Sequence, residues 1–298
     1  MQLIECVPNF SEGRNPEKME RIVDPFRRRA KVKLLDYQRD EDHNRLVVTV
    51  LGAPEALKAA LLAAVAEAIC LIDMTAHRGQ HPRMGAVDVV PFIPVRNLEM
   101  RDAVAFSREV AKEMADRFQL PVFLYEASAT QPGRRNLSDI RKGGFEGMAE
   151  KLKAPAWKPD FGPEKIHPTA GVTAVGARMP LVAFNVNLNT ADMEIARRIA
   201  KKIRYKDGGF PHCKAMGVLL KARGQVQVSM NLTDFTQTSL SRVFEAIRTE
   251  ADRLGVTIAG SEIVGLVPMA ALLDSAARYL GLENFLPAQV LETHIFLE

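Results

Sequence analysis

The sequence has few cysteines and no long uninterrupted apolar segment. Its 298 residues include three cysteines, Cys6, Cys70 and Cys213, whose wide spacing excludes a disulfide framework and a paired-cysteine metal site. The longest apolar stretch, residues 56–72, is interrupted by two charged side chains, so it predicts an amphipathic helix rather than a membrane span. The amino terminus lacks the charged and apolar regions of a signal peptide. We therefore expect a cytoplasmic protein without a membrane partner.

A strong excess of charge of one sign is also missing. The 40 basic and 36 acidic residues give a net charge of +4, and the basic residues are not gathered into one stripe. This distribution argues against a nucleic-acid partner. The sequence contains no Gly-x-Gly-x-x-Gly, P-loop or Gly-x-Ser-x-Gly motif, so it gives no support to dinucleotide, P-loop or serine-hydrolase chemistry.

The apolar pattern predicts an α+β protein made of two similar halves. In the first half it predicts a βαββαβ order, which is a ferredoxin-like unit, from strands at 3–10, 32–37, 46–51 and 86–94 and helices at 15–28 and 54–72. The same order recurs with strands at 181–188, 215–220, 226–232 and 258–267 and helices at 191–203 and 240–254. Thr190 is expected to cap the helix at 191–203. A helix at 101–118 and a strand at 122–125 extend the first half, and a helix at 269–280 follows the second.

A segment rich in proline and glycine, residues 154–176, separates the two passes and is expected to connect them. We place the two subdomains at 1–178 and 179–298. A cleft between two sheets is where a ligand is expected to bind.

The side chains that could carry chemistry are most concentrated in residues 77–88, between a predicted helix and a predicted apolar strand. This loop contains His77, Arg78, His81 and Arg83. A histidine titrates near neutral pH and can accept and return a proton in one turnover, and an arginine matches the geometry of a carboxylate. The alternative is a loop whose polar groups only cap the end of the preceding helix.

Three other segments are polar enough to line a ligand site. They are the turn after the first strand at 7–14, the hairpin loop at 40–45 and the segment at 160–171. Each also has a purely structural explanation, as a strand-to-helix connection, a solvated turn and a strap between subdomains.

Several of these segments resemble the formimidoyltransferase family. The matching stretches are ECVPNFSEGR (5–14), DHNR (42–45), HRGQHPRMGAVDVVPFIPV (77–95), and DFGP with HPTAGVTAVGAR (160–163 and 167–178). The resemblance is to the formimidoyltransferase module of formimidoyltransferase-cyclodeaminase and to the stand-alone glutamate formimidoyltransferases, and it continues to residue 274. It implies two ferredoxin-like subdomains in a duplicated arrangement, a ligand tunnel between them, and a homodimer.

The resemblance also implies the reaction and its principal residues. The formimidoyl group of N-formimidoyl-L-glutamate would pass to N5 of tetrahydrofolate, a co-substrate that can carry several glutamates, in histidine degradation and one-carbon metabolism, without a metal. The family's proton donor falls on His81. Its folate-binding segment falls on Gly162, Pro163, Glu164, Lys165, Ile166, His167, Pro168, Thr169, Ala170 and Gly171.

Polar residues in the same stretches are candidates for binding the substrates: Asn9, Asp40, Asn44, Arg45 and Arg83. The two arginines would hold carboxylates of the glutamate or of the folate tail and so position both substrates in one cleft.

One position departs from the family pattern. Gln38 stands where we expect an acidic residue, and Asp36, Asp40 or Asp42 could take its part. The second proton-transfer residue is therefore left open.

Three alternatives follow from the same residues. Within the family, formylglutamate or formimidoylglycine could be the donor. A metal-dependent formimidoylglutamate hydrolase would need clustered Asp and His ligands. A non-catalytic folate-binding module would keep residues 162–171 and would not need His81.

Overall fold

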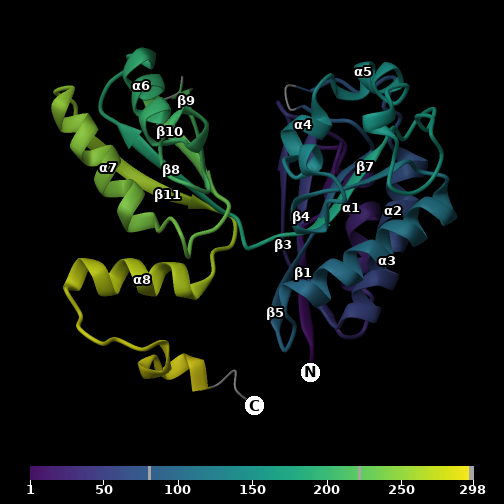
Figure 1. The fold of residues 1–298 in the computed structure, drawn as a ribbon, viewed down its shortest axis with the longest axis horizontal. Helices are drawn as coiled ribbons and strands as arrows, with labels where there is room; N and C mark the ends of the chain where they lie inside the picture. Colours follow the sequence, from purple (N-terminus) through teal and green to yellow (C-terminus); the bar gives the residue numbers. More distant parts are fainter. Residues whose placement is uncertain (80–81, 221–222, 295–298) are drawn as a thin grey trace. The chain divides into compact units, whose positions relative to one another are not determined.

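The structure, a computed structural model, describes residues 1–79, 82–220 and 223–294. His81, the predicted proton donor, lies outside the described residues. The chain divides into two compact units, Met1–Arg178 and Met179–Glu298, and each consists of a sheet with helices packed on it (Figure 1).

The first unit contains the predicted ferredoxin-like order. Its elements are β1 (Leu3–Cys6), β2 (Asn9–Phe10), α1 (Pro16–Arg27), β3 (Val32–Asp40), β4 (Arg45–Gly52), α2 (Pro54–Leu71) and β5 (Val87–Arg96). β3 pairs with β4, β4 pairs with β1 and β2, and both of these pair with β5, all antiparallel. The strand expected at 3–10 is two short strands, because Pro8 interrupts it and has no N–H to donate to a neighbouring strand.

Two further strands continue this sheet beyond β5. After α3 (Met100–Phe118) the chain forms β6 (Val122–Leu124), and later β7 (Thr173–Ala177), which lies between β5 and β6 and runs parallel to both. Residues 154–176, which we expected to connect the two halves, therefore also contribute to the first sheet. The end of that segment is a central strand of the first sheet, made of small and β-branched residues that fit a strand buried on both faces.

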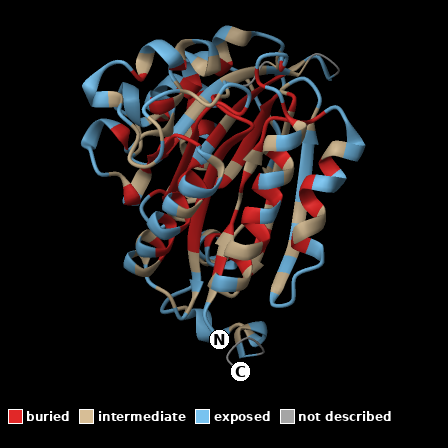
Figure 2. Ribbon diagram, turned by 90° about the vertical axis from the view of Figure 1, so that its right-hand side faces the viewer, coloured by how far each residue is buried: buried red, intermediate tan, exposed pale blue. Residues whose placement is uncertain are grey.

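Helices cover both faces of this part of the sheet. α1, α2 and α3 form one core with β1, β4 and β5. Two short helices that the sequence did not predict, α4 (Leu137–Arg141) and α5 (Gly144–Lys151), pack with β5, β6 and β7 on the other face. In Figure 2 the buried residues gather on the strands and on the helix sides that meet them. The apolar run at 86–94 belongs to a strand covered on both faces.

The second unit repeats the ferredoxin-like order. Its elements are β8 (Val182–Leu188), α6 (Met193–Ile203), β9 (Cys213–Leu220), β10 (Gln225–Leu232), α7 (Leu240–Arg253), β11 (Ile258–Val264) and α8 (Met269–Leu280). The strand order is β11-β8-β10-β9 and all pairs are antiparallel. The predicted α+β fold with two ferredoxin-like subdomains is confirmed. Short 3₁₀ helices lie at Glu126–Ser128, Pro132–Arg134, Pro155–Trp157, Tyr205–Asp207, Pro287–Gln289 and Leu291–His294.

The start of α6 differs from the prediction. Asp192, not Thr190, caps the helix, because the Asp192 carboxylate accepts the N–H of Glu194 at 2.8 Å. The Thr190 hydroxyl instead accepts the N–H of Asp192 at 3.2 Å. The threonine therefore holds the turn that precedes the cap.

Candidate active site

The strand pairing brings the predicted site segments to one edge of the first sheet. Phe10, at the end of β2, pairs with Leu46 and with Val87, near the starts of β4 and β5. β5, β6 and β7 are parallel, so their first residues lie at this same edge. The turn after β2, the β3–β4 hairpin loop, the loop before β5 and the segment before β7 consequently meet.

The turn after β2 is bonded to the chain entering β5. The Ser11 hydroxyl donates to the carbonyl of Gly85 at 2.8 Å, and the Ser11 N–H donates to the carbonyl of Ala86 at 2.9 Å. Asn9 lies on β2, where its amide donates to the carbonyl of Val7 at 2.9 Å. The turn therefore has the local backbone bonding expected of a strand-to-helix connection, and it also anchors the loop before β5.

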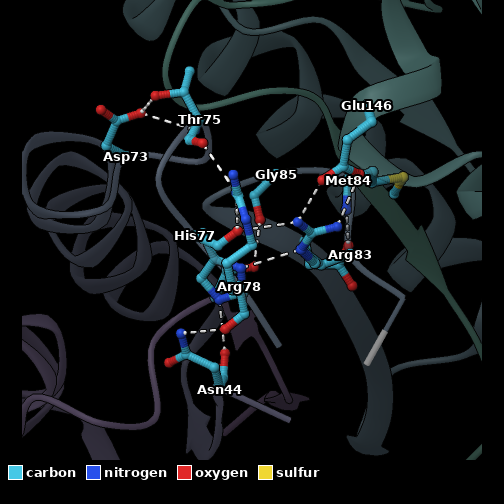
Figure 3. Close-up of polar contacts among 11 residues, drawn as sticks. Asn44, Asp73, Thr75, His77, Arg78, Arg83, Met84, Gly85 and Glu146 are labelled. Carbon is cyan, nitrogen blue, oxygen red and sulfur yellow. Dashed lines mark hydrogen bonds and ion pairs between the residues drawn. The ribbon is translucent and has the colours of Figure 1, made fainter. Parts of the chain in front are cut away.

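Asn44 joins the hairpin loop to two other loops. Its side-chain oxygen accepts the N–H of Gly13 at 2.9 Å, and its side-chain nitrogen donates to the carbonyl of Arg78 at 3.0 Å (Figure 3). Its φ of 49° lies in the left-handed region, which asparagine adopts more readily than most residues. Asn44 is buried, and its hydrogen bonds set the position of the hairpin relative to the loop before β5, which contains His77, Arg78 and Arg83 and is called the His/Arg loop below.

Asp40 and His43 pair within the hairpin loop. One carboxylate oxygen of Asp40 accepts the backbone N–H of His43 at 2.8 Å, and the other lies 2.8 Å from Nδ1 of its ring. Burial by itself would raise the pKa of Asp40, but the hydrogen bonds and the charge of His43 outweigh it and lower that pKa. Asp40 is therefore a carboxylate at neutral pH.

Gln38 lies on β3, as Asp36 and Asp40 do. Its side-chain amide donates to the carboxylate of Asp36 at 2.9 Å.

His77 is buried and both of its ring nitrogens are engaged. Nε2 lies 3.0 Å from the carbonyl oxygen of Asn44, and Nδ1 accepts the Nε–H of Arg83 at 3.1 Å (Figure 3). A carbonyl can only accept, so the ring carries its proton on Nε2. Burial lowers the pKa of His77, and the charge of Arg83 lowers it further. His77 is therefore a neutral structural histidine.

Arg83 links the same loop to α5. Its Nη1 and Nη2 donate to the two carboxylate oxygens of Glu146 at 3.0 and 2.7 Å, and Nη2 also donates to the carbonyl of His77 at 3.2 Å. The hydrogen bond from Arg83 lowers the pKa of Glu146. Because a carboxylate of the protein occupies this guanidinium, the pair holds α5 against the loop, and a substrate carboxylate would have to displace Glu146.

The predicted folate-binding segment begins near β6 and ends against the His/Arg loop. A Cβ on Gly162 would lie 2.1 Å from the carbonyl oxygen of Leu120, and one on Gly171 would lie 2.2 Å from that of Met84. The Ala86 N–H donates to the carbonyl of Ala170 at 2.9 Å. The end of the segment is therefore fixed to the chain that leads into β5.

His167, inside this segment, supports a tight turn. Its Nδ1 accepts the N–H of Ala170 at 2.9 Å, and its backbone exchanges two hydrogen bonds with Gly171. Burial lowers the pKa of His167. The imidazole of His167 is therefore neutral at neutral pH, and it stabilises the turn by accepting the N–H of Ala170.

A charged cluster that the sequence analysis did not assemble lies at the start of β5. Asp88 is 3% exposed, accepts the N–H of Met84 at 2.9 Å, and accepts a hydrogen bond from Nη2 of Arg141. Arg45 lies at the same edge of the sheet, because Phe10 pairs with both Leu46 and Val87. Burial lowers the pKa of Arg45, and the positive charge of Arg141 lowers it further. Arg141 was not predicted, because α4, on which it lies, could not be recognised from its five residues alone.

The second unit has a hydrogen-bonded network of polar residues, most of them buried, on one face of its sheet. On β8 the residues Phe184 and Val186 pack with the helices, so Asn185 and Asn187 lie on the opposite face of the sheet. Nε2 of Gln227 donates at 2.8 Å both to the side-chain oxygen of Asn187 and to a carboxylate oxygen of Glu262. Asn185 donates to the same oxygen of Glu262 at 3.2 Å. Polar residues alternating with apolar ones in FNVNL were the signal that could have found this network.

Two absences hold for the described parts of the chain. Within residues 1–79, 82–220 and 223–294, no group of three or more His, Cys, Asp or Glu side chains is arranged to hold a metal ion. Over the same ranges, every helix is too short or too polar to cross a membrane.

Comparison with known protein families gives matches over both units. The description "Formiminotransferase domain, N-terminal subdomain" matches residues 3–178, and "Formiminotransferase domain" matches residues 183–294. The chain belongs to the formiminotransferase family. Each matched part of the chain contains one of the two sheets.

Relatives resemble the chain along nearly its whole length. Glutamate formimidoyltransferase of Streptococcus pyogenes serotype M1 is 50% identical over 295 residues, which cover 99% of each chain. The protein of the same name from Thermoplasma acidophilum is 45% identical over 98% of this chain and 97% of its own. Formimidoyltransferase-cyclodeaminase of Dictyostelium discoideum is 42% identical over 100% of this chain and 56% of its own.

Solved structures are much less similar. A microcompartment protein from Desulfitobacterium hafniense DCB covers 92% of this chain with a TM-score of 0.24 and 10% identity. A similarity this weak supports no argument about the chain.

Proposed function

We propose that this chain transfers the formimidoyl group of N-formimidoyl-L-glutamate to N5 of tetrahydrofolate. The observation that carries the proposal is the 50% identity to a stand-alone glutamate formimidoyltransferase over 99% of both chains. The geometry of the first unit supports it, because the four segments that carry the family motifs meet at one edge of the sheet. A functional site of this kind needs its groups held on a rigid scaffold.

The chemistry requires two proton transfers. N5 of tetrahydrofolate attacks the formimidoyl carbon and loses its proton, and the glutamate nitrogen must be protonated before it leaves the tetrahedral intermediate. One histidine that accepts the first proton and donates the second accelerates such a reaction by about 10²- to 10⁴-fold. We assign this role to His81, because the other histidine of its loop, His77, has both ring nitrogens engaged and a lowered pKa.

A second proton-transfer residue is proposed on the hairpin. Asp40 is favoured over Asp36 and Asp42, because both oxygens of its carboxylate are held by His43, in a hairpin that Asn44 ties to the carbonyl of Arg78. Besides taking part in proton transfer, the carboxylate would stabilise the positive charge that develops on N5 during the attack.

The folate site and the setting of the reaction are also proposals. We place the co-substrate, tetrahydrofolate, against residues 162–171, supported by the contact of their last residues with the chain entering β5. We further propose a homodimer, a cytoplasmic location, and a role in histidine degradation and one-carbon metabolism. The family resemblance supports the homodimer and the metabolic role.

One assay tests the proposed function and separates it from the alternatives. Purified protein is supplied with formimidoylglutamate, formylglutamate or formimidoylglycine, each with and without tetrahydrofolate, and bound metal is measured on the same sample. We expect turnover only with tetrahydrofolate and fastest with formimidoylglutamate. Turnover without folate and dependent on metal would instead establish a hydrolase.

Ligand binding gives a second and independent readout. Folinate, a stable analogue of the product, should raise the melting temperature in proportion to the logarithm of its concentration, because it binds only the folded state. Binding of folinate without turnover of any donor would establish a non-catalytic folate-binding module. No binding and no turnover would refute the proposed function.

A further inference from the structure

The cluster of Arg45, Asp88 and Arg141 has features of an anion-binding site. Asp88 lies at the start of β5, Arg45 begins β4 and Arg141 ends α4, so three elements far apart in sequence supply it. The side chain of Asp88 is 4% exposed and that of Arg141 is 16% exposed. The charges are therefore shielded from water, where an interaction with an anion is stronger than at the open surface.

The orientation of Arg141 is fixed by the residues that follow it. Gly143 and Gly144 both adopt left-handed backbone angles, φ 95° and φ 61°, which glycine permits without steric cost. This sharp turn separates α4 from α5 and lets Arg141 reach Asp88 while Glu146 reaches Arg83. The same short segment thus contacts both the start of β5 and the His/Arg loop.

The hydrogen bonds of the cluster do not use all of the donors of Arg141. Its Nη2 donates to Asp88, whereas its Nε, which is buried, has no hydrogen-bond partner among the described residues. A buried N–H without a hydrogen-bond partner is rare in proteins, and a bound ligand would supply the missing acceptor. A guanidinium presents five N–H groups in a planar fork, so one carboxylate of the protein leaves donors for a second.

The charge balance points the same way. The carboxylate of Asp88 is paired with the guanidinium of Arg141. Arg45 begins the strand whose second residue pairs with Phe10, as Val87 does, and its pKa is lowered partly by the charge of Arg141. Asp40 offsets this repulsion at Arg45, but it is also paired with His43. An anion held by both arginines would remove the repulsion between them and give the buried Nε an acceptor.

We propose that Arg141, together with Arg45, binds a carboxylate group of a substrate at this edge of the first sheet. The inference rests on the proposed function and adds a residue that positions and selects the substrate. A carboxylate matches the planar fork of arginine and can accept two parallel hydrogen bonds from it. Asp88 acts as the positioning residue, because it orients Arg141 and holds the N–H of Met84.

Two substrates of the reaction carry carboxylates, so the experiment must distinguish them. The variant Arg141→Gln and the control Arg135→Gln are assayed with formimidoylglutamate, with tetrahydrofolate, and with tetrahydropteroate, which lacks the glutamate tail. Arg135 is an exposed arginine in the same part of the chain. Dissociation constants of L-glutamate and of glutarate are measured by calorimetry on each protein.

For Arg141→Gln we expect KM to rise about 10- to 100-fold for the substrate whose carboxylate is bound, which corresponds to losing one hydrogen bond between charged groups. A rise for formimidoylglutamate with weaker binding of L-glutamate and glutarate identifies the donor. A rise for tetrahydrofolate but not for tetrahydropteroate identifies the folate tail. We expect kcat to change little, the melting temperature to fall because buried Asp88 loses its charged partner, and Arg135→Gln to behave as the unmodified protein.

A purely structural role for Arg141 would give a different result. The proposal is overturned if Arg141→Gln folds and all KM values and dissociation constants stay within about twofold of those of Arg135→Gln. If Arg141→Gln does not fold, Arg141→Lys is assayed in its place. Lysine keeps a positive charge beside Asp88 but lacks the planar pair of N–H donors of a guanidinium, so KM should still rise about tenfold. If the unmodified protein turns over formimidoylglutamate but Arg141→Gln behaves as Arg135→Gln, this inference fails and the proposed function stands. If the unmodified protein has no turnover, the proposed function itself fails.

Discussion

Nε of Arg83 donates to Nδ1 of His77 at 3.1 Å, and this contact fixes the tautomer of a buried imidazole. The opposite ring nitrogen then holds the proton that is donated to the carbonyl of Asn44 at 3.0 Å. Because Arg83 also binds Glu146 through both Nη atoms, one chain of hydrogen bonds joins the hairpin, the His/Arg loop and α5. Four predictions follow from this network and its surroundings.

His81→Ala should lower kcat by about 10²- to 10⁴-fold and leave the affinity for folinate nearly unchanged, because it removes a proton-transfer group but not a binding group. Single-turnover rates and folinate titrations on the same protein check this. His212→Ala, at an exposed histidine of the second unit, is the control and should retain full activity. Retention of more than a tenth of kcat by His81→Ala would move the proton transfer to Asp40 or His43.

The stability of the protein should fall as pH drops below about 6.5, the usual histidine pKa, toward the lowered pKa of His77. In this window the unfolded chain binds a proton that the folded chain does not, so acid favours unfolding by at most about 1.4 kcal/mol per pH unit for each such histidine. His167, whose pKa burial also lowers, acts in the same direction. Above pH 6.5 both states are neutral and this effect vanishes.

Urea unfolding at pH 7.5 and pH 5.5 measures the effect, with His77→Gln as the variant. The glutamine does not titrate, so the loss of stability between the two pH values should be smaller than in the unmodified protein. At pH 7.5 the variant should itself be less stable by about 1–3 kcal/mol, because a hydrogen bond to Asn44 or to Arg83 is lost. An equal pH dependence in both proteins would show that His77 is not a buried neutral histidine.

Arg83 and Glu146 should be coupled energetically. The side chain of Arg83 is 12% exposed and that of Glu146 is 60% exposed, so water screens the pair from one side. We expect a double-mutant cycle with Arg83→Met and Glu146→Gln to give about 1 kcal/mol of coupling in the free energy of unfolding. The pair Lys153 and Glu150, both largely exposed on the surface, serves as the comparison and should give less. Coupling no greater than in that pair would show that Arg83 does not hold α5.

Gly85→Ala should weaken folinate binding and destabilise the protein. A Cβ at this position would lie 2.1 Å from the carbonyl oxygen of Val172, so the loop before β5 and the end of the predicted folate segment must separate. Such forced shifts in a packed region cost about 1–3 kcal/mol. Gly133→Ala is the matched control, since a Cβ there meets no atom within 4 Å. Unchanged folinate affinity in Gly85→Ala would show that folate binding does not depend on the close approach of Gly85 to Val172.

The repeated βαββαβ order could be read from the sequence because it depends on local signals. Apolar alternation marks strands such as β4, and Asn15 followed by Pro16 marks the start of α1, where Asn15 accepts the N–H of Lys18 at 3.1 Å. The concentration of polar residues in the loop before β5 was equally visible in the sequence. These features need only a residue and its near neighbours in the chain.

The strand β7 and the helices α4 and α5 could not be read in this way. β7 is a short run of small residues after a segment rich in proline and glycine, and it becomes a strand because β5 and β6 pair with it on both sides. α4 has five residues, too few to be stable without packing, and Ile140 within it is fully buried. Pairing and burial supply what the local sequence does not.

The sequence by itself determined which residue types were available to the site, the histidines, arginines and glycines of its motifs. Only the tertiary structure decided how they are used. It engages Asn44 and Arg83 in bonds within the protein and brings Arg141, which lies in no recognised motif, beside Arg45 and Asp88. A side chain's role depends on which partners have already taken its hydrogen bonds, and those partners lie tens of residues away in the chain, beyond the reach of any local pattern.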